Sequence, residues 1–266
     1  SLFMSLSLVP ILLTKRKAPN FKKISGMKLK EVYKSSPFGV VSSFLIGISH
    51  SAVFSLIAVY ATSMNFSILE VSIVTFLFAI SGAISQWPIG KLSDVLDRRI
   101  VIIYTTFGAA LFCFLAIISS GQMYMPAGLA TSKIFFYICI MCFSFCSLPM
   151  FALIFAHTND FIPKEKFVAA GAGLQFVFGL GAICGPFMCS LFMEFLGENG
   201  FFIFLIIFHS FIGLFGIYRM QIRESGDNPD SQFAPMPQTI TPAGIELNPS
   251  TEPIDEPNNL NEFKKI

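Results

Sequence analysis

The 266 residues are 54% hydrophobic and 13% charged, about half the charged fraction of an average soluble domain. The chain has 32 Phe and 11 Met against one Trp, and this composition excludes a cytosolic enzyme, a nucleic-acid-binding module and a disordered protein. The net charge of +2 is too small to indicate a polyanionic partner. We therefore expect a protein embedded in a lipid bilayer.

The chain begins with an apolar segment, residues 1–13, that is too short to cross a bilayer, since a spanning helix takes about 20 residues. A basic run follows over residues 14–37, whereas in a secretory signal the charge precedes the apolar region. We interpret 1–13 as the end of an earlier membrane helix cut by truncation, with a short interfacial anchor as the alternative. Residues 14–37 are then a basic cytoplasmic linker, and Pro37 suits the first turn of the next helix.

Six segments are apolar and long enough to span the bilayer. They are residues 38–61, 68–89, 100–120, 134–156, 168–193 and 200–219. These segments are apolar on every side, whereas the strands of a membrane barrel would alternate with a period of two. The sequence therefore predicts an all-α polytopic membrane protein, with a six-helix transmembrane bundle over residues 38–220.

Positive charges gather in alternate turns of this bundle. The basic turns hold Lys91, Arg98, Arg99, Lys164 and Lys166, and Arg219 and Arg223 follow the last span. Because basic loops stay in the cytoplasm, we predict an integral protein of the inner or plasma membrane with both ends cytoplasmic. The remaining segment, residues 221–266, is rich in Pro, Asn, Ser, Asp and Glu, and it is predicted to be a disordered cytoplasmic tail.

The most specific pattern is GKLSDVLDRR, residues 90–99, between the second and third spans. Gly90 is expected to let the backbone turn at the membrane surface and to let helices approach closely. Asp94 lies among cations, where it can pair with Arg98 or Arg99 or cap a helix N-terminus. An ordinary basic turn explains the arginines, but it does not explain a Gly, a Ser-Asp pair and an Arg pair at these spacings.

This pattern resembles the loop signature of the major facilitator superfamily, roughly Gly-x-Leu-Ser-Asp-(basic)-x-Gly-Arg-Arg, which follows the second and eighth helices of that fold. Here Val95 stands at a position that is usually basic, and Asp97 stands at a position that is usually Gly. Substitution at the Gly position is common in second-half copies. The resemblance implies that Asp94 contacts the start of a helix in the other half and steadies one conformational state.

A second pattern supports the same family. The sequence GLGAICGP, residues 179–186, places small residues four apart at Gly181 and Gly185 and closes them with Pro186. Small residues let membrane helices pack backbone to backbone, and Pro bends a helix. The superfamily has a Gly-Pro element in its fifth helix and again in its eleventh. The resemblance therefore implies that residues 1–220 hold the end of helix six, the central loop and helices 7–12, the C-terminal half of the fold.

A narrower similarity joins QWPIG, residues 86–90, and AHTND, residues 156–160, to the uncharacterised YcaD-like branch of the superfamily. Family membership would imply secondary active transport of a small molecule by alternating access. The partners are then a small-molecule substrate, the lipid bilayer and the missing N-terminal half of the same chain, without nucleic acid. No nucleotide-binding motif is present in the sequence, so an ion gradient or the substrate's own gradient would supply the energy.

His50 lies at the middle of the first span, flanked by Ser49 and Ser51. Polar residues at membrane depth are candidate functional residues. The resemblance implies that this span, as helix seven, lines the central cavity, where His50 could bind substrate or carry H⁺ as the coupling ion. A histidine hydrogen-bonded between helices explains the same pattern equally well. His209 in the sixth span is expected to pack, because helix twelve is usually peripheral in this fold.

His157, Asn159 and Asp160 lie at the cytoplasmic end of the fourth span. They could gate the inner mouth through hydrogen bonds to the facing half, which we favour, or cap a helix end.

All six cysteines lie inside apolar runs, and we expect small packing residues rather than disulfides. They are Cys113, Cys139, Cys142, Cys146, Cys184 and Cys189. Three of them, Cys139, Cys142 and Cys146, share one face of the fourth span. A metal or redox site is not expected there, because that face offers no second ligand pair and no His. No metal and no cofactor is therefore expected.

Two other functional classes remain open. A non-transporting receptor or regulator could use the same scaffold. An intramembrane serine protease would need Ser81 to form a dyad with His157 or His209, and the surrounding sequence suits that role poorly.

Overall fold

The computed structural model describes residues 27–122 and 129–224, together with residues 226, 233 and 235. Within these residues every regular element is a helix, and six helical segments are long and apolar enough to span a membrane. The predicted all-α architecture with six spans is confirmed. The predicted helix end at 1–13 and nearly all of the predicted tail at 221–266 lie outside the described residues.

The helices follow the predicted segments closely. In chain order they are α2 (Leu29–Ser35), α3 (Pro37–Ser63), α4 (Ile68–Val95), α5 (Arg98–Gln122), α6 (Leu129–Ser147), α7 (Met150–Asn159), the 3₁₀-helix η2 (Lys164–Lys166), α8 (Phe167–Leu196) and α9 (Gly200–Ile222). Helix α2 forms from the end of the basic linker, and α6 and α7 together make the fourth span.

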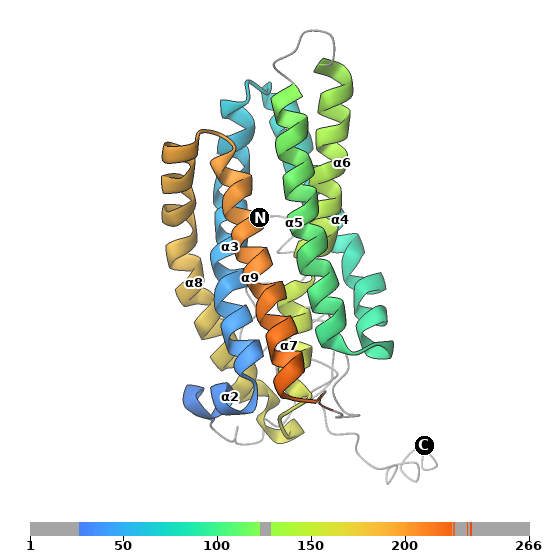
Figure 1. Ribbon diagram of the computed structural model, residues 1–266, viewed down its shortest axis with the longest axis vertical. Helices are drawn as coiled ribbons and strands as arrows, with labels where there is room; N and C mark the ends of the chain where they lie inside the picture. The colour runs from blue at the N-terminus through green and yellow to red at the C-terminus, as the bar shows by residue number, and fades with distance from the viewer. Residues whose placement is uncertain (1–26, 123–128, 225, 227–232, 234, 236–266) are drawn as a thin grey trace, which may run out of the picture.

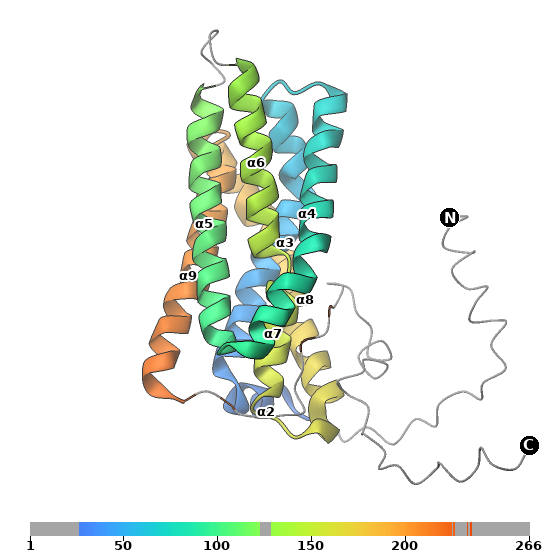
Figure 2. The same cartoon turned by 90° about the vertical axis from the view of Figure 1, so that its right-hand side faces the viewer.

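The helices run up and down along the long axis of the molecule (Figures 1 and 2). Helix α2, the α4–α5 and α7–α8 connections and the end of α9 lie at one end, and the α3–α4 and α8–α9 connections, the end of α5 and the start of α6 lie at the opposite end. The basic turns therefore share one end, which we call the basic end and which Arg98, Arg99 and Arg223 mark. That this end faces the cytoplasm stays a prediction from the charge distribution.

Short-range hydrogen bonds fix where several helices begin and end. Before α3, the Ser36 hydroxyl accepts the backbone N–H of Gly39 at 3.2 Å. Before α4, Ser67 and Glu70 form a reciprocal capping box, with the Ser67 N–H donating to the carboxylate at 2.8 Å. After α8, Gly197 has φ = 67°, a left-handed conformation that only glycine adopts without strain.

The fourth span is interrupted rather than continuous. The sequence predicts a single stretch at 134–156, but the helix breaks after Ser147 and resumes as α7 beyond Pro149. Proline cannot donate the backbone hydrogen bond that would continue α6, and its ring crowds the preceding turn. By contrast, Pro88 and Pro186 lie inside the unbroken helices α4 and α8.

Helix α3 packs against both α8 and α9. The contact with α8 is close: a Cβ at Gly181 would collide with the carbonyl oxygen of Phe44, and one at Gly185 with that of Ile48. Glycine at these positions lets the two backbones touch. The small-residue face predicted from the sequence therefore lies against α3.

Aromatic rings fill the core at the end opposite the basic end. Tyr60 of α3 lies 6.0 Å from Phe136 of α6, and 5.2 and 4.9 Å from Phe201 and Phe202 of α9, measured between ring centroids. All four rings are at most 1% exposed. This aromatic cluster joins three helices that are far apart in the sequence.

Helices α4 and α8 are the least covered of the six spans. Their outer faces carry large apolar side chains that are 60–76% exposed, namely Phe76, Ile84, Trp87, Phe176, Ile183 and Phe187. Such faces need either lipid or another protein surface against them.

Candidate functional site

Arg98 joins three helices at the basic end. Its Nη2 donates to Oδ1 of Asp94 at 3.0 Å, and its Nη1 donates to Oδ1 of Asp160 and to the carbonyl of Ala156 at 3.2 Å. The arginine is 8% exposed. The carbonyls at the end of α7 add negative potential there, which favours a cation. The loop pattern and the AHTND segment, predicted as separate motifs, thus form one network across α4, α5 and α7.

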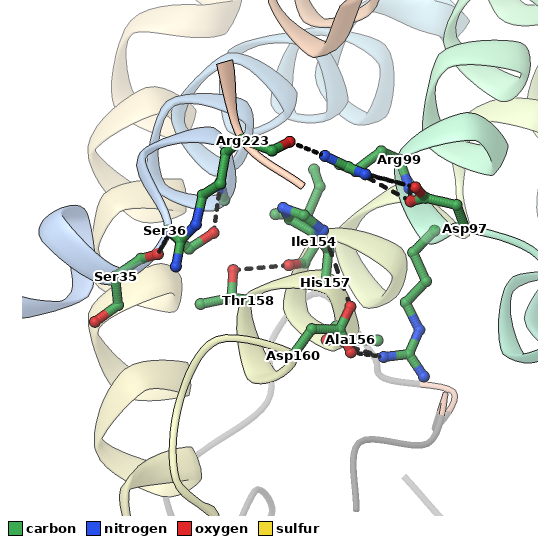
Figure 3. Close-up of polar contacts among 12 residues, drawn as sticks. Ser35, Ser36, Asp97, Arg99, Ile154, Ala156, His157, Thr158, Asp160 and Arg223 are labelled. Carbon is green, nitrogen blue, oxygen red and sulfur yellow. Dashed lines mark hydrogen bonds and ion pairs between the residues drawn. The ribbon is translucent and has the colours of Figure 1, made fainter. Parts of the chain in front are cut away.

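The neighbouring Arg99 pairs with Asp97 instead. Its Nη2 lies 2.6 Å from Oδ2, and its backbone N–H donates to Oδ1 at 3.0 Å (Figure 3). Burial alone would raise the pKa of the Asp97 carboxyl, but the hydrogen bonds and charge of Arg99 outweigh it and hold the pKa below its usual range. Asp97 therefore has a defined structural role at the position where the family signature usually has Gly.

A third arginine closes the basic end. Arg223 lies with its guanidinium 4.0 Å from the ring centroid of Phe161, and its Nη1 donates to the carbonyl of Ser35 at 2.5 Å. Arg99 donates in turn to the carbonyl of Arg223 at 2.6 Å (Figure 3). The cavity beside these groups, lined also by His157, has a volume of about 10 Å³, which is room for a single water.

The predicted gate residues are packed within this half of the fold. His157 is 3% exposed, and its ring lies 5.1 Å from the rings of both Phe38 and Phe161. Asn159 is also buried, and Asp160 is the member of the group that pairs with Arg98. The structure thus brings Asp160 to the signature loop and surrounds His157 with aromatic rings.

Gly90 does not turn the chain, and that prediction is wrong. Helix α4 continues through Gly90 to Val95, so the turn comes after it. Close approach is what this glycine permits, because a Cβ would collide with the ring of Phe233. The backbone N–H of Phe233 donates to Oδ1 of Asp94 at 2.9 Å. Asp94 therefore accepts hydrogen bonds both from an arginine and from a backbone amide.

A second polar group lies at the middle of the bundle, where His50 and His209 flank Ser147. Nε2 of His50 lies 3.1 Å from both the carbonyl and the hydroxyl oxygen of Ser147. Nε2 of His209 lies 2.8 Å from the same hydroxyl, and its Nδ1 lies 2.9 Å from the carbonyl of Leu205 and 3.3 Å from Ser49 Oγ. Both histidines are at most 1% exposed, so this group is enclosed by α3, α6 and α9.

The residues that form this network are only in part the ones that the sequence predicts. His50 points between helices of this half, and Ser49 joins it through His209. Ser51 stays apart, since its hydroxyl donates to the carbonyl of its own helix at 3.1 Å. His209, expected only to pack, is a full member, and Ser147 was missed. A serine two residues before a proline inside an apolar span is the signal that could have found it.

The alternative sites gain no support from the geometry. The Ser81 hydroxyl donates to the carbonyl of Met141 at 2.6 Å, so it does not form a dyad with a histidine. All six cysteines are free thiols, and Cys184 is exposed rather than packed. Among the residues that the structure describes, no group of three or more His, Cys, Asp and Glu side chains could hold a metal.

Six apolar spans, one end rich in paired arginines and an enclosed polar group at mid-depth define a helical integral membrane protein. The family model described as Major Facilitator Superfamily matches residues 39–253, a range that extends over all six spans. The chain belongs to the Major Facilitator Superfamily, which is a family of transporters and not of enzymes.

Curated relatives give the same family at low identity. The chain is 23% identical over 201 residues to an "Uncharacterized MFS-type transporter" of Yersinia enterocolitica, an alignment that covers 76% of this chain and 47% of the relative. It is 26% identical over 191 residues to the "Uncharacterized MFS-type transporter YfkF" of Bacillus subtilis, covering 69% and 45%. The chain thus spans about half the length of the relatives that it matches. No solved structure matches it significantly.

Proposed function

We propose that this chain forms the C-terminal six-helix half, helices 7–12, of a secondary active transporter of a small molecule. The observation that carries the proposal is the superfamily match across all six spans. The length of the relatives supports the assignment to one half, because the alignments cover 45–47% of two of them. We place the chain in the YcaD-like branch on the two short patterns quoted above.

The missing N-terminal half is the partner that we propose for α4 and α8. These two spans expose contiguous apolar side chains, whereas α3 and the α6–α7 span are more deeply covered. Two pseudo-symmetric halves that face each other would enclose a substrate site near the midplane. Lipid would cover the remaining outer surfaces.

The signature loop would bias the equilibrium between inward- and outward-facing states. Asp94 is tied to Arg98, and its carboxylate also accepts a backbone N–H. The first amides of a helix offer donors of that kind, so a helix start in the other half would suit the same carboxylate. A contact made in one state only would shift the population toward that state. His157, Asn159 and Asp160 would then form the inner gate beside it.

Proton coupling is the energy source that we propose. His50, with Ser49 and Ser51 beside it, lies in the membrane-spanning part of the chain, and an imidazole there needs polar partners or a transported proton to be tolerated. The protein would sit in the inner or plasma membrane with the basic end, the linker and the tail in the cytoplasm.

Solute counterflow in proteoliposomes tests this function with the full-length protein. Pools of labelled sugars, amino acids, nucleosides and lipophilic cations are offered with and without an imposed pH gradient. We expect at least one pool to exchange faster than in empty vesicles, and the gradient to drive its accumulation. Exchange without accumulation would remove proton coupling, and no exchange of any pool would favour the non-transporting receptor.

A further inference from the structure

The chemistry of the acceptors fixes the direction of each hydrogen bond in the central polar group. A carbonyl can only accept, so the contact with Leu205 places a hydrogen on Nδ1 of His209 and leaves the lone pair on Nε2. The Ser147 carbonyl likewise places a hydrogen on Nε2 of His50. The single hydroxyl hydrogen of Ser147 is then directed to His209, and its oxygen accepts from His50. Both hydrogen bonds of this series are therefore donated in the same direction, from His50 to Ser147 and from Ser147 to His209.

We propose that His50, Ser147 and His209 form a relay that holds one coupling proton and passes it between α3 and α9. This inference rests on the proposed transport function. A proton that reaches the pair binds Nδ1 of His50, and the hydrogen on Nε2 moves to the oxygen of Ser147. The hydroxyl hydrogen of Ser147 moves at the same time to Nε2 of His209. His50 is left neutral with its hydrogen on Nδ1, Ser147 is unchanged, and His209 carries the positive charge.

The surroundings limit the relay to a single proton. Two imidazolium ions that share one serine would repel each other strongly in a medium of low dielectric constant. In the described part of the chain, the charged side chains of the helices packed against α3, α6 and α9 lie toward the helix ends. They are Lys30, Glu31 and Lys34 on α2, Glu70, Lys91 and Asp94 on α4, Arg98 and Arg99 on α5, Lys133 on α6, Glu194 on α8 and Arg219 on α9. The third histidine, His157, lies at the end of α7, and the other titratable groups are cysteine thiols and tyrosine hydroxyls.

Aromatic rings lie beside both histidines. The ring of Phe178 lies 6.3 Å from that of His50, and the ring of Phe143 lies 5.5 Å from that of His209. A single positive charge is then stabilised by the Leu205 carbonyl, the Ser147 oxygens and Ser49.

The position of Ser147 connects the proton to the shape of the fourth span. Ser147 is the last residue of α6, and Pro149 separates it from α7. When His209 gains the proton, its Nε2 changes from acceptor to donor, so the Ser147 hydroxyl must rotate away. The hydrogen bonds at the helix break therefore depend on the location of the proton. Interrupted membrane helices are typical ion sites of secondary transporters, because their backbone carbonyls are available as ligands.

Nuclear magnetic resonance of ¹⁵N-labelled histidine in the full-length protein, held in lipid nanodiscs, tests the relay without any transported solute. The ¹⁵N shifts report which ring nitrogen carries a hydrogen, and His50→Gln and His209→Asn assign the signals. At high pH we expect the hydrogen on Nε2 of His50 and on Nδ1 of His209. On acidification we expect one proton for the pair, with both signals moving in a single step. Two separate steps that end with two protons, or the opposite tautomers, would overturn the relay.

Variants of the central residue sharpen the test. Ser147→Ala keeps both rings but removes the link, so the two signals should titrate independently, whereas Ser147→Thr should restore the shared step. Ser190→Ala is the matched control, because this exposed hydroxyl donates to the carbonyl of Phe187 in its own helix. A shared step that persists in a folded Ser147→Ala variant would refute the relay. Since no flux is measured, loss of the relay here is distinct from an absence of transport in the counterflow assay.

Discussion

Arg98 is held at the basic end by two carboxylates and a backbone carbonyl, and its removal would leave the Asp160 carboxylate, only 10% exposed, without this cation. We expect Arg98→Ala to lower the free energy of unfolding by about 3–5 kcal/mol, the usual cost of breaking a buried ion pair. Lys133→Ala is the control, since Lys133 and Glu70 are each about a quarter exposed and such a pair contributes under about 1 kcal/mol.

Chemical unfolding of the full-length protein in detergent micelles compares the two variants. Equal losses of unfolding free energy in both variants would mean that burial between α4, α5 and α7 does not strengthen the ion pairs of Arg98.

The Asp97 carboxyl predicts a pH dependence of stability. Its pKa is lower in the folded protein, where Arg99 donates to it, than in the unfolded chain, so the unfolded chain binds more protons as the pH falls. The stabilisation is therefore complete above the ordinary carboxyl pKa of about 3.9 and is lost as the pH falls through the lower folded value. Asp97→Asn should be less stable than the wild type at neutral pH, and the difference should shrink in acid.

Unfolding of both proteins across the acid range provides the measurement. A gap between wild type and Asp97→Asn that widens on acidification would show that the ion pair does not lower the pKa of Asp97.

At the residue scale, the spacing of residues in the sequence predicted only contacts between residues that are close in the sequence. Asp94 and Arg98 are four residues apart across the short connection between α4 and α5, and their pairing was one of the predicted alternatives. The bond from Arg98 to Asp160 crosses 62 positions, and the bond from Ser147 to His209 also crosses 62. No local pattern encodes such contacts, because they depend on how whole helices pack.

At the scale of elements, the contact between α3 and α8 is the most sensitive to side-chain volume. We expect Gly181→Ala to destabilise the protein by about 1–3 kcal/mol, since the added methyl group meets the backbone of α3 rather than a movable side chain. Gly179→Ala is the matched control on the same helix, because a Cβ there meets nothing within 4 Å. The control should be neutral or slightly stabilising, as Ala favours helices over Gly.

Thermal unfolding of the two purified variants in detergent separates these cases. If Gly179→Ala proved as harmful as Gly181→Ala, intrinsic backbone effects would explain both, and the close approach of α3 and α8 would not matter.

The existence of the spans was predictable because length and hydropathy alone decide whether a segment can cross hydrocarbon. The break in the fourth span was not predictable, because proline does not always interrupt a helix. Pro88 and Pro186 lie inside the unbroken helices α4 and α8. Whether a proline interrupts a membrane helix depends on the neighbours that satisfy the freed carbonyls. At Ser147 that neighbour is His50, which the local sequence cannot specify.

For the whole molecule, the placement of all basic turns at one end predicts a labelling pattern. In a full-length variant without its native cysteines, Lys91→Cys and Glu165→Cys should react with an impermeant maleimide only after the cells are opened. Asn65→Cys and Asn199→Cys, at the opposite end, should react in intact cells. Asn65, Glu165 and Asn199 lie between the long helices and Lys91 lies near the end of α4, and all four side chains are exposed, so each is accessible from one aqueous phase.

Reaction of Lys91→Cys and Asn65→Cys from the same side would contradict the six-span topology. Reaction of all four with the sides exchanged would instead reverse the predicted orientation and move the tail outside.

The aromatic cluster around Tyr60 has a mechanical consequence. Rings from α3, α6 and α9 interlock there, so that end of the bundle resists deformation and the helices must tilt together. A helix of 27 residues such as α3 is about 40 Å long. Tilting such a helix about its aromatic end by roughly 10° would move its other end, at Pro37, by about 7 Å, so a small local rearrangement could open or close a passage at the basic end.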